Sequence, residues 1–371
     1  MRYLLVDTNY SGFLDGVYRG NPKLPSASYA EQLTAIHAGL FGEAAFEVAA
    51  LRQLGHEAEV VVANAYPAQS AWAKENGVAL PPAARLKPAM RRRLVPWLRR
   101  EHSTEWMWVA LLAQVRAYRP DVVQIQIPDY MPPEIVRAIH DEVRLVVGQL
   151  AAPLPPWPLL GYDLMVSSLP NLVEAFRSQG LSAEWIPLAF EPSLLERIPS
   201  GDRDVQVSFV GSLSPHHASR LTFLSEVAAR RDMDIWTADA TGPTAGGIRA
   251  TFHPAVWGRQ MYEVLGRSLA TINNHIDVAG DYANNLRLYE ATGMGALLIT
   301  DAKKNLGQLF EVGREVVAYR DSAECSELIA HYVDHPSDAA AIAHAGQQRT
   351  LRDHTWLDRM ARLAEFVKAR T

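Results

Sequence analysis

Short runs of aliphatic residues alternate along this chain with longer helix-like stretches, and a glycine marks many of the changes. Residues 44–65 show the pattern once: a helix over 44–54, a stop at Gly55 and a strand over 58–63. Glycine is common just after a helix because it adopts the left-handed conformation without strain. Helices that alternate with buried strands are typical of βαβ units and a parallel sheet. The sequence therefore predicts an α/β protein.

The alternation occurs in two series. Strands are predicted over 3–6, 58–63, 122–127, 145–149 and 164–167 in the first series, and over 205–210, 233–236, 270–273 and 296–300 in the second. The predicted helices span 44–54, 106–118 and 171–179, then 220–231, 262–268, 286–292, 325–333, 338–349 and 355–369. Residues 190–206, which are rich in Pro, Ser, Gly and charge, have the composition of a linker. We expect two α/β domains of similar size that face each other across a cleft.

Composition excludes several classes of protein. The chain has 371 residues, more than one ordinary core holds, and its 48% hydrophobic and 21% charged residues are typical of globular domains. A net charge of −5 gives no general argument for nucleic-acid binding. One cysteine, Cys325, excludes an intramolecular disulfide framework. Because the sequence has neither a signal-peptide pattern nor a transmembrane run, we expect a cytoplasmic protein.

Two motifs in the second series suggest an anion site. The strand 205–210 runs directly into Gly211 and Ser212, where the backbone can approach a phosphate closely. The helix over 286–292 carries Arg287 and Glu290 three residues apart, so both lie on one face. A carboxylate can hold ribose hydroxyls, and a guanidinium can neutralise a diphosphate. An ordinary turn and a solvated ion pair would give the same patterns.

The first series offers three candidates for a general base. Asp7 follows the first strand directly, and Asp129 follows the strand over 122–127. His37 is the third. A base must lie within hydrogen-bond reach of the hydroxyl that it deprotonates. For each of them, a cap, a turn or a satisfied core position is the competing interpretation.

Clusters of histidine and of basic residues have other interpretations. His216 and His217 are adjacent, and consecutive side chains do not converge well on one metal ion, so we expect a loop that faces phosphate, and the same applies to His275. The segment from Arg85 to Arg100 contains seven cations with interleaved apolar residues and no acid. It fits a solvated helix face, and it also fits peripheral contact with an anionic membrane or an anionic acceptor.

Residues 257–359 resemble the C-terminal domain of bacterial glycosyltransferases of the CgeB-like group, the spore-maturation-protein type. The matching pieces are VWGRQMYEVLGRS, TINNHID, NNLRLYEATGMGALLIT, NLGQLFEVGREVVAYRD and IAHAGQQRTLRDHTW. Two earlier stretches are also similar, VSFVGSLSPHHASR and YDLMVSSLPNLVEAFRSQG.

The resemblance implies a GT-B fold with two Rossmann-like domains and no essential metal. It implies an acceptor-side domain over 1–190, a nucleotide-sugar domain over 205–354, and a C-terminal helix over 355–371 that crosses back to the first domain. A nucleotide-sugar donor would be a substrate, so no cofactor is expected, and the acceptor could be a glycan, lipid, protein or small molecule. Carried over by position, Glu290 would bind the ribose, Arg287 with the Gly211–Ser212 backbone the diphosphate, and Asn284 and Asn285 the donor sugar or phosphate.

One departure leaves the stereochemical outcome open. Many retaining GT-B enzymes have two glutamates separated by seven residues, and counting back from Glu290 places the first at Tyr282, beside Asp281. The retaining mechanism is therefore not transferred to this chain. Two other functions stay open on the same fold: a nucleotide-sugar epimerase, which needs no acceptor, and a non-catalytic nucleotide-sugar-binding protein.

Overall fold

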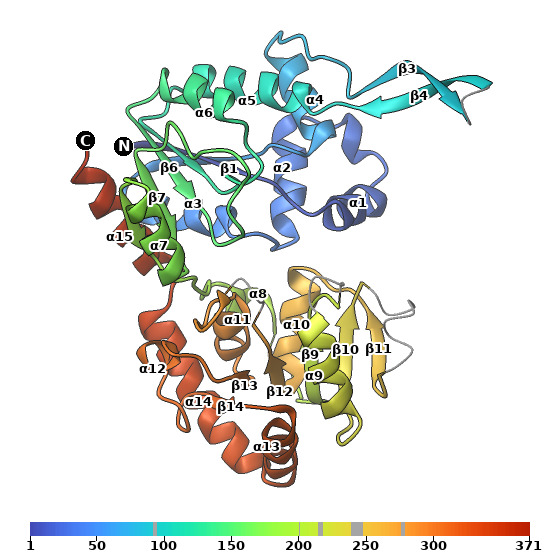
Figure 1. Cartoon of the computed structure of the whole chain (residues 1–371), viewed down its shortest axis with the longest axis vertical. Helices are drawn as coiled ribbons and strands as arrows, with labels where there is room; N and C mark the ends of the chain where they lie inside the picture. Colours follow the sequence, from blue (N-terminus) through green and yellow to red (C-terminus); the bar gives the residue numbers. More distant parts are fainter. Residues whose placement is uncertain (92–94, 200, 214–217, 239–247, 276–278) are drawn as a thin grey trace. The chain divides into compact units, whose positions relative to one another are not determined.

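The computed structural model describes residues 1–91, 95–199, 201–213, 218–238, 248–275 and 279–371. These residues form two compact units. Unit 1 comprises Met1–Val166, Phe176–Ala183 and Ala369–Thr371, and unit 2 comprises Ser167–Ala175 and Glu184–Lys368. Each unit contains a six-stranded sheet, and parallel pairing predominates in both sheets. The predicted α/β class is therefore confirmed (Figure 1).

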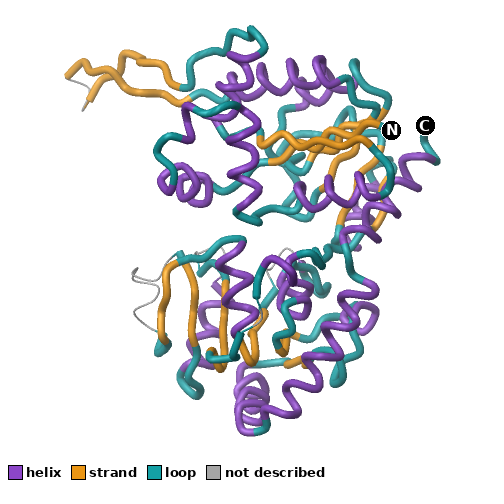
Figure 2. The backbone as a smooth tube through the Cα atoms, turned by 180° about the vertical axis from the view of Figure 1, so that it is seen from behind, coloured by secondary structure: helices purple, strands orange, loops and turns teal. Residues whose placement is uncertain are grey.

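The sheet of unit 1 has the strand order β2-β1-β5-β6-β7-β8. Its strands are β1 (Arg2–Asp7), β2 (Glu57–Val62), β5 (Val122–Ile125), β6 (Leu145–Gln149), β7 (Leu164–Ser167) and β8 (Ala183–Trp185). The helices are α1 (Ser11–Gly20), the short η1 (Leu24–Ser26), α2 (Tyr29–Ala38), α3 (Ala44–Gln53), α4 (Tyr66–Glu75), α5 (Glu105–Tyr118) and α6 (Pro133–His140), and α7 (Pro170–Ser178) begins in unit 2 and ends in unit 1. Figure 2 shows helices on both sides of this sheet. Apolar residues of α5 and α6, such as Leu111 and Ile139, form one core with Val123 of β5.

The sheet of unit 2 has the order β11-β10-β9-β12-β13-β14. Its strands are β9 (Val205–Val210), β10 (Asp234–Thr237), β11 (Thr251–Pro254), β12 (Ser268–Asn273), β13 (Leu297–Asp301) and β14 (Val317–Tyr319). The helices are α8 (Leu194–Arg197), α9 (Ala218–Ala228), α10 (Arg259–Arg267), α11 (Arg287–Gly293), α12 (Leu306–Leu309), α13 (Ser322–Asp334), α14 (Pro336–Asp353) and α15 (Trp356–Lys368). Leu224 of α9 and Ile329 of α13 share a core with Ile272 of β12.

Each sheet has a point where the direction of strand addition reverses. In unit 2, β9 lies between β10 and β12, and in unit 1, β1 lies between β2 and β5. Loops that leave neighbouring strands at such a point diverge to opposite faces and open a crevice at the carboxyl ends. The fold thus marks the ends of β9 and β12, and of β1 and β5, as places for ligands.

The segment between the two predicted series is folded into unit 2. Phe190 is buried and pairs with Thr355 in an isolated parallel bridge, and α8 follows it. Arg359 of α15 is also buried and donates hydrogen bonds to the carbonyl oxygens of Pro187 and Leu188, at 3.0 and 3.3 Å. The whole of α15 therefore belongs to unit 2, whereas residues 369–371 belong to unit 1. The domain limits at 190 and 205 stay a prediction.

The basic segment forms a β-hairpin, so the interpretation as a helix face is wrong. Strands β3 (Ala84–Arg91) and β4 (Val95–His102) pair antiparallel in a sheet of their own. Figure 1 shows this hairpin projecting from the rest of unit 1. Arg92 and Arg93 lie outside the described residues. Among the helices that the structure describes, none is both long and apolar enough to span a bilayer.

Candidate functional site

Arg287 and Glu290 form a buried ion pair beside the end of β9. Arg287 Nη1 lies 2.8 Å from Glu290 Oε2, and Nη2 donates to the carbonyl oxygen of Val210 at 3.1 Å. The exposed fractions of the two side chains are 14% and 8%. Burial raises the pKa of Glu290, and the opposing effects of Arg287 and the Tyr262 hydroxyl do not fully offset it. The predicted pair therefore exists, and it joins the first turn of α11 to the last residue of β9.

A chain of amide and hydroxyl groups continues from the start of α11 across the ends of β12 and β13. Asn285 Nδ2 donates to Asn273 Oδ1 at 2.6 Å, and Asn273 Nδ2 donates to Thr300 Oγ1 at 3.0 Å. Asn285 Oδ1 also accepts from the backbone of Leu288 at 3.3 Å, which satisfies an amide of the first turn of α11. Asn284 is partly exposed. Asn285 thus has a structural role in holding α11 against β12.

Arg220 connects the two loops that leave the sheet at its reversal point. Its Nη1 donates to the carbonyl oxygen of Ser212 at 3.0 Å, and its Nη2 donates to that of Asn274 at 2.8 Å. The side chain also lies over the ring of Phe209, 5.7 Å from its centroid. A buried guanidinium therefore lies where the loops after β9 and β12 meet, and it is not among the site residues predicted from the sequence.

A histidine and an aspartate pair at the ends of β12 and β13. His275 Nδ1 lies 2.5 Å from Asp301 Oδ1, and the His275 amide donates to the same oxygen at 3.1 Å. Lys303 Nζ lies 3.3 Å from the other oxygen, Asp301 Oδ2. Burial alone would raise the pKa of Asp301, but the contacts with His275 and Lys303 bring it below its usual value. Asp301 is therefore held as a carboxylate.

The amide of Gly211 is paired within the sheet. It donates to the carbonyl oxygen of Trp236 at 3.1 Å, which extends the pairing of β9 with β10. A Cβ atom at this position would lie 3.1 Å from Phe209 Cζ, so the close approach of that ring explains the glycine. In this loop, the residue that follows, Ser212, contributes its carbonyl oxygen to Arg220.

In unit 1, Asp7 ends β1 at the reversal point of the sheet. Its Oδ1 accepts a hydrogen bond from the amide of Thr8 at 2.7 Å. Burial raises the pKa of Asp7 to about 6, although the hydrogen bond from Thr8 opposes the shift. Gly42 has φ +86°, and a Cβ on it would lie 3.5 Å from Asp7 Oδ2. The absence of a side chain at Gly42 therefore keeps the region beside this carboxyl open.

A second buried acid lies near Asp7, and sequence reasoning missed it. Glu47 of α3 is completely buried, and its Oε2 accepts hydrogen bonds from Gln124 Nε2 at 2.9 Å and from Gln126 Nε2. Burial, with the charges of Glu43 and Asp7, raises the pKa of Glu47 well above its usual value. This buried carboxyl group thus lies beside the end of β5.

The three predicted bases do not form one cluster. Asp129 is exposed in the turn after β5, and His37 lies on α2. Burial, with a contribution from the charge of Arg52, lowers the pKa of His37 to about 4. Within the described residues, no hydrogen bond or ion pair joins Asp7, His37 and Asp129.

Other predicted residues lie outside the site or outside the description. His216 and His217 are not among the described residues. Asp281, beside the position where a retaining enzyme would have its first glutamate, is exposed and pairs with Lys304 at 2.5 Å.

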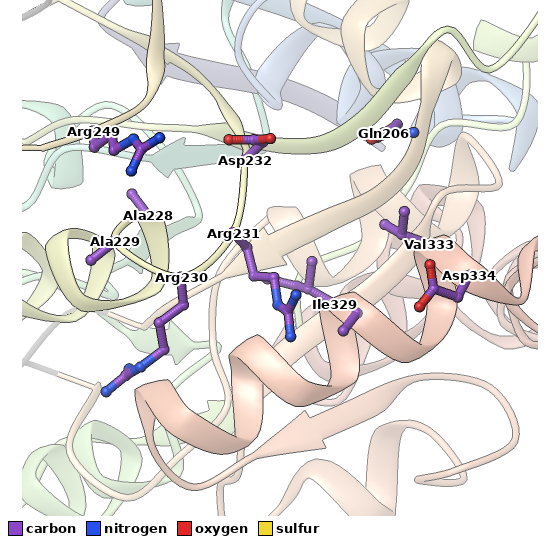
Figure 3. Close-up of a pocket in the computed structure, with 11 residues that line it drawn as sticks. Gln206, Ala228, Ala229, Arg230, Arg231, Asp232, Arg249, Ile329, Val333 and Asp334 are labelled. Carbon is purple, nitrogen blue, oxygen red and sulfur yellow. The ribbon is translucent and has the colours of Figure 1, made fainter.

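A cavity of about 270 Å³ lies at the opposite edge of the sheet in unit 2. Figure 3 shows its lining, with Gln206 and Asp232, which stand near the starts of β9 and β10. Arg231 in this lining donates to the carbonyl oxygen of Ser326 at 2.9 Å. Because open parallel sheets bind ligands at the carboxyl ends of their strands, this cavity is separate from the site described above.

Residues 209–365 match a family model that is described as glycosyl transferase-like. This part of the chain is therefore similar to glycosyl transferase-like domains. The match spans β9 to α15 and so contains Arg220, His275, Arg287 and Glu290. Among curated proteins, none matches this sequence.

Solved structures show the fold of the whole chain. HepE of Anabaena, in complex with UDP and glucose, is 12% identical with a TM-score of 0.59, and the match covers 100% of both chains. AviGT4, a glycosyltransferase involved in avilamycin A biosynthesis, is 14% identical with a TM-score of 0.56 over 98% of this chain and 96% of that one. The pneumococcal O-GlcNAc transferase GtfA, in complex with UDP and GlcNAc, is 8% identical with a TM-score of 0.57 over 100% and 99%. The chain therefore has the GT-B fold.

Proposed function

We propose that this protein is a glycosyltransferase that moves a sugar from a nucleotide-sugar donor to an acceptor hydroxyl. The observation that carries the proposal is the buried Arg287–Glu290 pair, joined to the end of β9 inside a glycosyl transferase-like domain. The pair lies at the edge where open parallel sheets bind nucleotides. HepE and GtfA were solved with UDP, which makes uridine nucleotides the first donors to test.

In this proposal, different polar groups at the carboxyl edge of unit 2 bind different parts of the donor. Glu290 binds the ribose hydroxyls, and the N–H groups of Arg287 that are not used within the protein bind the diphosphate. Arg287 and neighbouring backbone amides take the place of a divalent metal ion, because a fixed guanidinium can stabilise the charge of a leaving diphosphate. Asn284 and Asn285, which shortly precede Arg287 in the sequence, complete the donor site.

The acceptor side of the proposal assigns Asp7 as the first choice of base. A carboxyl group whose pKa is about 6 is ionised at neutral pH and still basic enough to take a proton from a hydroxyl. His37, with a pKa of about 4, is a weaker base. Asp129 is exposed and is kept as the alternative. We leave the anomeric outcome of the reaction open.

Product analysis tests the proposal against the two alternatives. The protein is incubated with UDP-glucose, UDP-GlcNAc and other nucleotide-sugars, with and without cell-derived acceptors. The products are separated and their masses are determined by mass spectrometry. Formation of a glycosylated acceptor with release of the nucleoside diphosphate supports transfer. A changed nucleotide-sugar of the same mass would show epimerisation, and donor binding without any turnover would show a binding protein. The assignment to the CgeB-like group rests on the sequence motifs and belongs to the same proposal.

We also propose that the β3–β4 hairpin contacts an anionic membrane surface from the cytoplasmic side. Its two strands contain Arg85, Lys87, Arg91, Arg99 and Arg100. Basic residues with apolar residues between them are typical of segments that bind at an anionic bilayer interface. Lys87 forms an ion pair with Glu101, the residue that pairs with Arg85 in the hairpin.

Co-sedimentation with vesicles tests the membrane proposal. Vesicles containing phosphatidylserine should pellet the wild type at low salt, and neutral vesicles should not. The Arg91/Arg92/Arg93→Ala variant should lose this binding, whereas Arg19→Ala/Lys23→Ala, which removes two exposed cations of unit 1, should keep it. Equal partitioning of all three proteins would contradict the membrane contact and leave an anionic soluble acceptor as the better interpretation.

A further inference from the structure

The side chain of His275 is completely buried, yet one of its ring nitrogens has no use within the protein. Nδ1 faces the carboxylate of Asp301 at 2.5 Å, and a carboxylate only accepts hydrogen bonds, so Nδ1 carries a proton. Among the residues that the structure describes, Nε2 has no hydrogen-bond partner. Leaving a buried polar atom unpaired costs about 1–3 kcal/mol. An atom of this kind beside a ligand site is a candidate contact for the ligand.

His275 lies within the polar network of the proposed donor site. Its own position is two residues beyond the end of β12, and the preceding carbonyl, that of Asn274, accepts from Arg220. Asp301 is reached from Asn285 through Asn273 and Thr300, whose hydroxyl donates to Asp301 Oδ1 at 3.4 Å. The loop that carries His275 is therefore connected to both the β9 loop and the start of α11.

The charges around the ring decide which ligand group it can meet. Lys303 lies 3.3 Å from Asp301 and also donates to the carbonyl oxygen of Gly280 at 2.7 Å, so the negative charge of Asp301 already has a fixed cation beside it. With the proton on Nδ1, the neutral tautomer of the ring presents a lone pair at Nε2. A lone pair repels phosphate oxygens, which also only accept, and it attracts a hydroxyl group.

We propose that His275 Nε2 accepts a hydrogen bond from a hydroxyl of the transferred sugar, with Asp301 as the residue that orients the ring. This inference rests on the proposed function, because it adds a sugar-specific contact to the donor site. His275 then selects donors by the hydroxyl pattern of the sugar. Binding of the nucleoside diphosphate part of the donor does not depend on His275. Asp301 acts through His275 and is a positioning residue.

Calorimetry with UDP and with UDP-glucose tests the contact on the full chain. His275→Ala should weaken the binding of UDP-glucose about tenfold, the upper range for one neutral hydrogen bond, and should leave the Kd for UDP unchanged. His275→Gln, which retains a group that can accept a hydrogen bond, should recover part of the loss. The matched control is His253→Gln, since His253 pairs with Asp234 at 2.6 Å in the same unit but stands in β11.

The possible outcomes separate this inference from the proposed function. Wild-type protein that binds neither UDP nor UDP-glucose would contradict uridine donors and, with them, the sugar contact tested here. Binding of both by the wild type, with an equal loss for both in His275→Ala, would place His275 on the diphosphate or in a purely structural role and would overturn the inference alone. A second readout is the ¹⁵N shift of His275 Nε2, which should move on addition of UDP-glucose and stay in place with UDP.

Discussion

His354 should make the folding stability of this protein depend on pH between 7 and 5. The ring is buried between α14 and α15: Nε2 lies 2.8 Å from the carbonyl oxygen of Leu309, and Nδ1 lies 2.8 Å from Arg359 Nη2. A carbonyl only accepts and a guanidinium only donates, so the neutral ring with its proton on Nε2 fits both partners. Burial lowers the pKa of His354 to about 4, although the hydrogen bond to Leu309 opposes the shift.

The size of this stability change follows from the pKa values of His354 in the unfolded and folded states. In the unfolded chain His354 has a pKa of 6.5, so above this pH the neutral ring costs nothing on folding. As the pH falls from 6.5 toward 4, the unfolded state binds a proton that the folded state does not, and folding stability decreases. For a folded pKa near 4, this loss is about 2 kcal/mol at pH 5 and about 0.2 kcal/mol at pH 7.

Urea unfolding at pH 7 and pH 5, with wild type and His354→Gln, measures this contribution. Every other titrating group is common to the two proteins, so the difference between their pH dependences isolates His354. The wild type should lose about 2 kcal/mol more than the variant between pH 7 and pH 5. Equal losses would show that His354 is accessible to protons in the folded state, and the packing around Arg359 described here would be wrong.

Four further predictions concern the site and the packing around it. Glu290→Ala should weaken binding of a nucleoside diphosphate by about 1–3 kcal/mol, and unchanged affinity in a folded variant would remove the ribose assignment. Chelation of divalent ions should leave transferase activity intact, whereas loss with EDTA and recovery with magnesium or manganese would show a metal requirement. A base with a pKa of about 6 makes kcat/KM fall below pH 6, and Asp7→Asn should remove this fall from the residual activity. If kcat/KM of the variant still falls below pH 6, another residue is the base. Gly346→Ala, whose Cβ would lie 2.2 Å from the carbonyl oxygen of Glu315, should lower the free energy of unfolding by about 1–3 kcal/mol, while Gly307→Ala, which has open space, should not.

The buried strands could be predicted from the sequence because they are continuous apolar runs. β9 was predicted over 205–210 and has those bounds, and β6 and β7 likewise match. β8 and β14 have three residues each, which is too short for a periodic signal. The hairpin was missed because Pro88 and Pro96 stand inside its strands, and proline within a run argues against a strand. A readable signal for α2 was also overlooked: Ser28 and Glu31 form a capping box.

Contacts in the candidate site differ in how far apart their residues lie in the sequence, and this separation decides whether they could be predicted. Arg287 and Glu290 are three residues apart on one helix, so their pairing could be expected from spacing alone. His275 meets Asp301 across 26 residues, because the parallel register of β12 and β13 brings the two strand ends together. Glu47 meets Gln126 across 79 residues. Contacts of this kind depend on sheet order and register, which the residues of one strand do not specify.

Hydrogen–deuterium exchange with and without UDP tests the central claim most directly, because it needs no acceptor. If the donor binds as proposed, UDP should slow exchange in three segments at the carboxyl edge of unit 2: residues 210–213, 273–275 and 284–290. The cavity at the opposite edge, lined by Arg231 and Val333, serves as an internal control and should be unaffected. Protection confined to that cavity or to unit 1, or no protection anywhere, would contradict a nucleotide-sugar site built around Arg287 and Glu290.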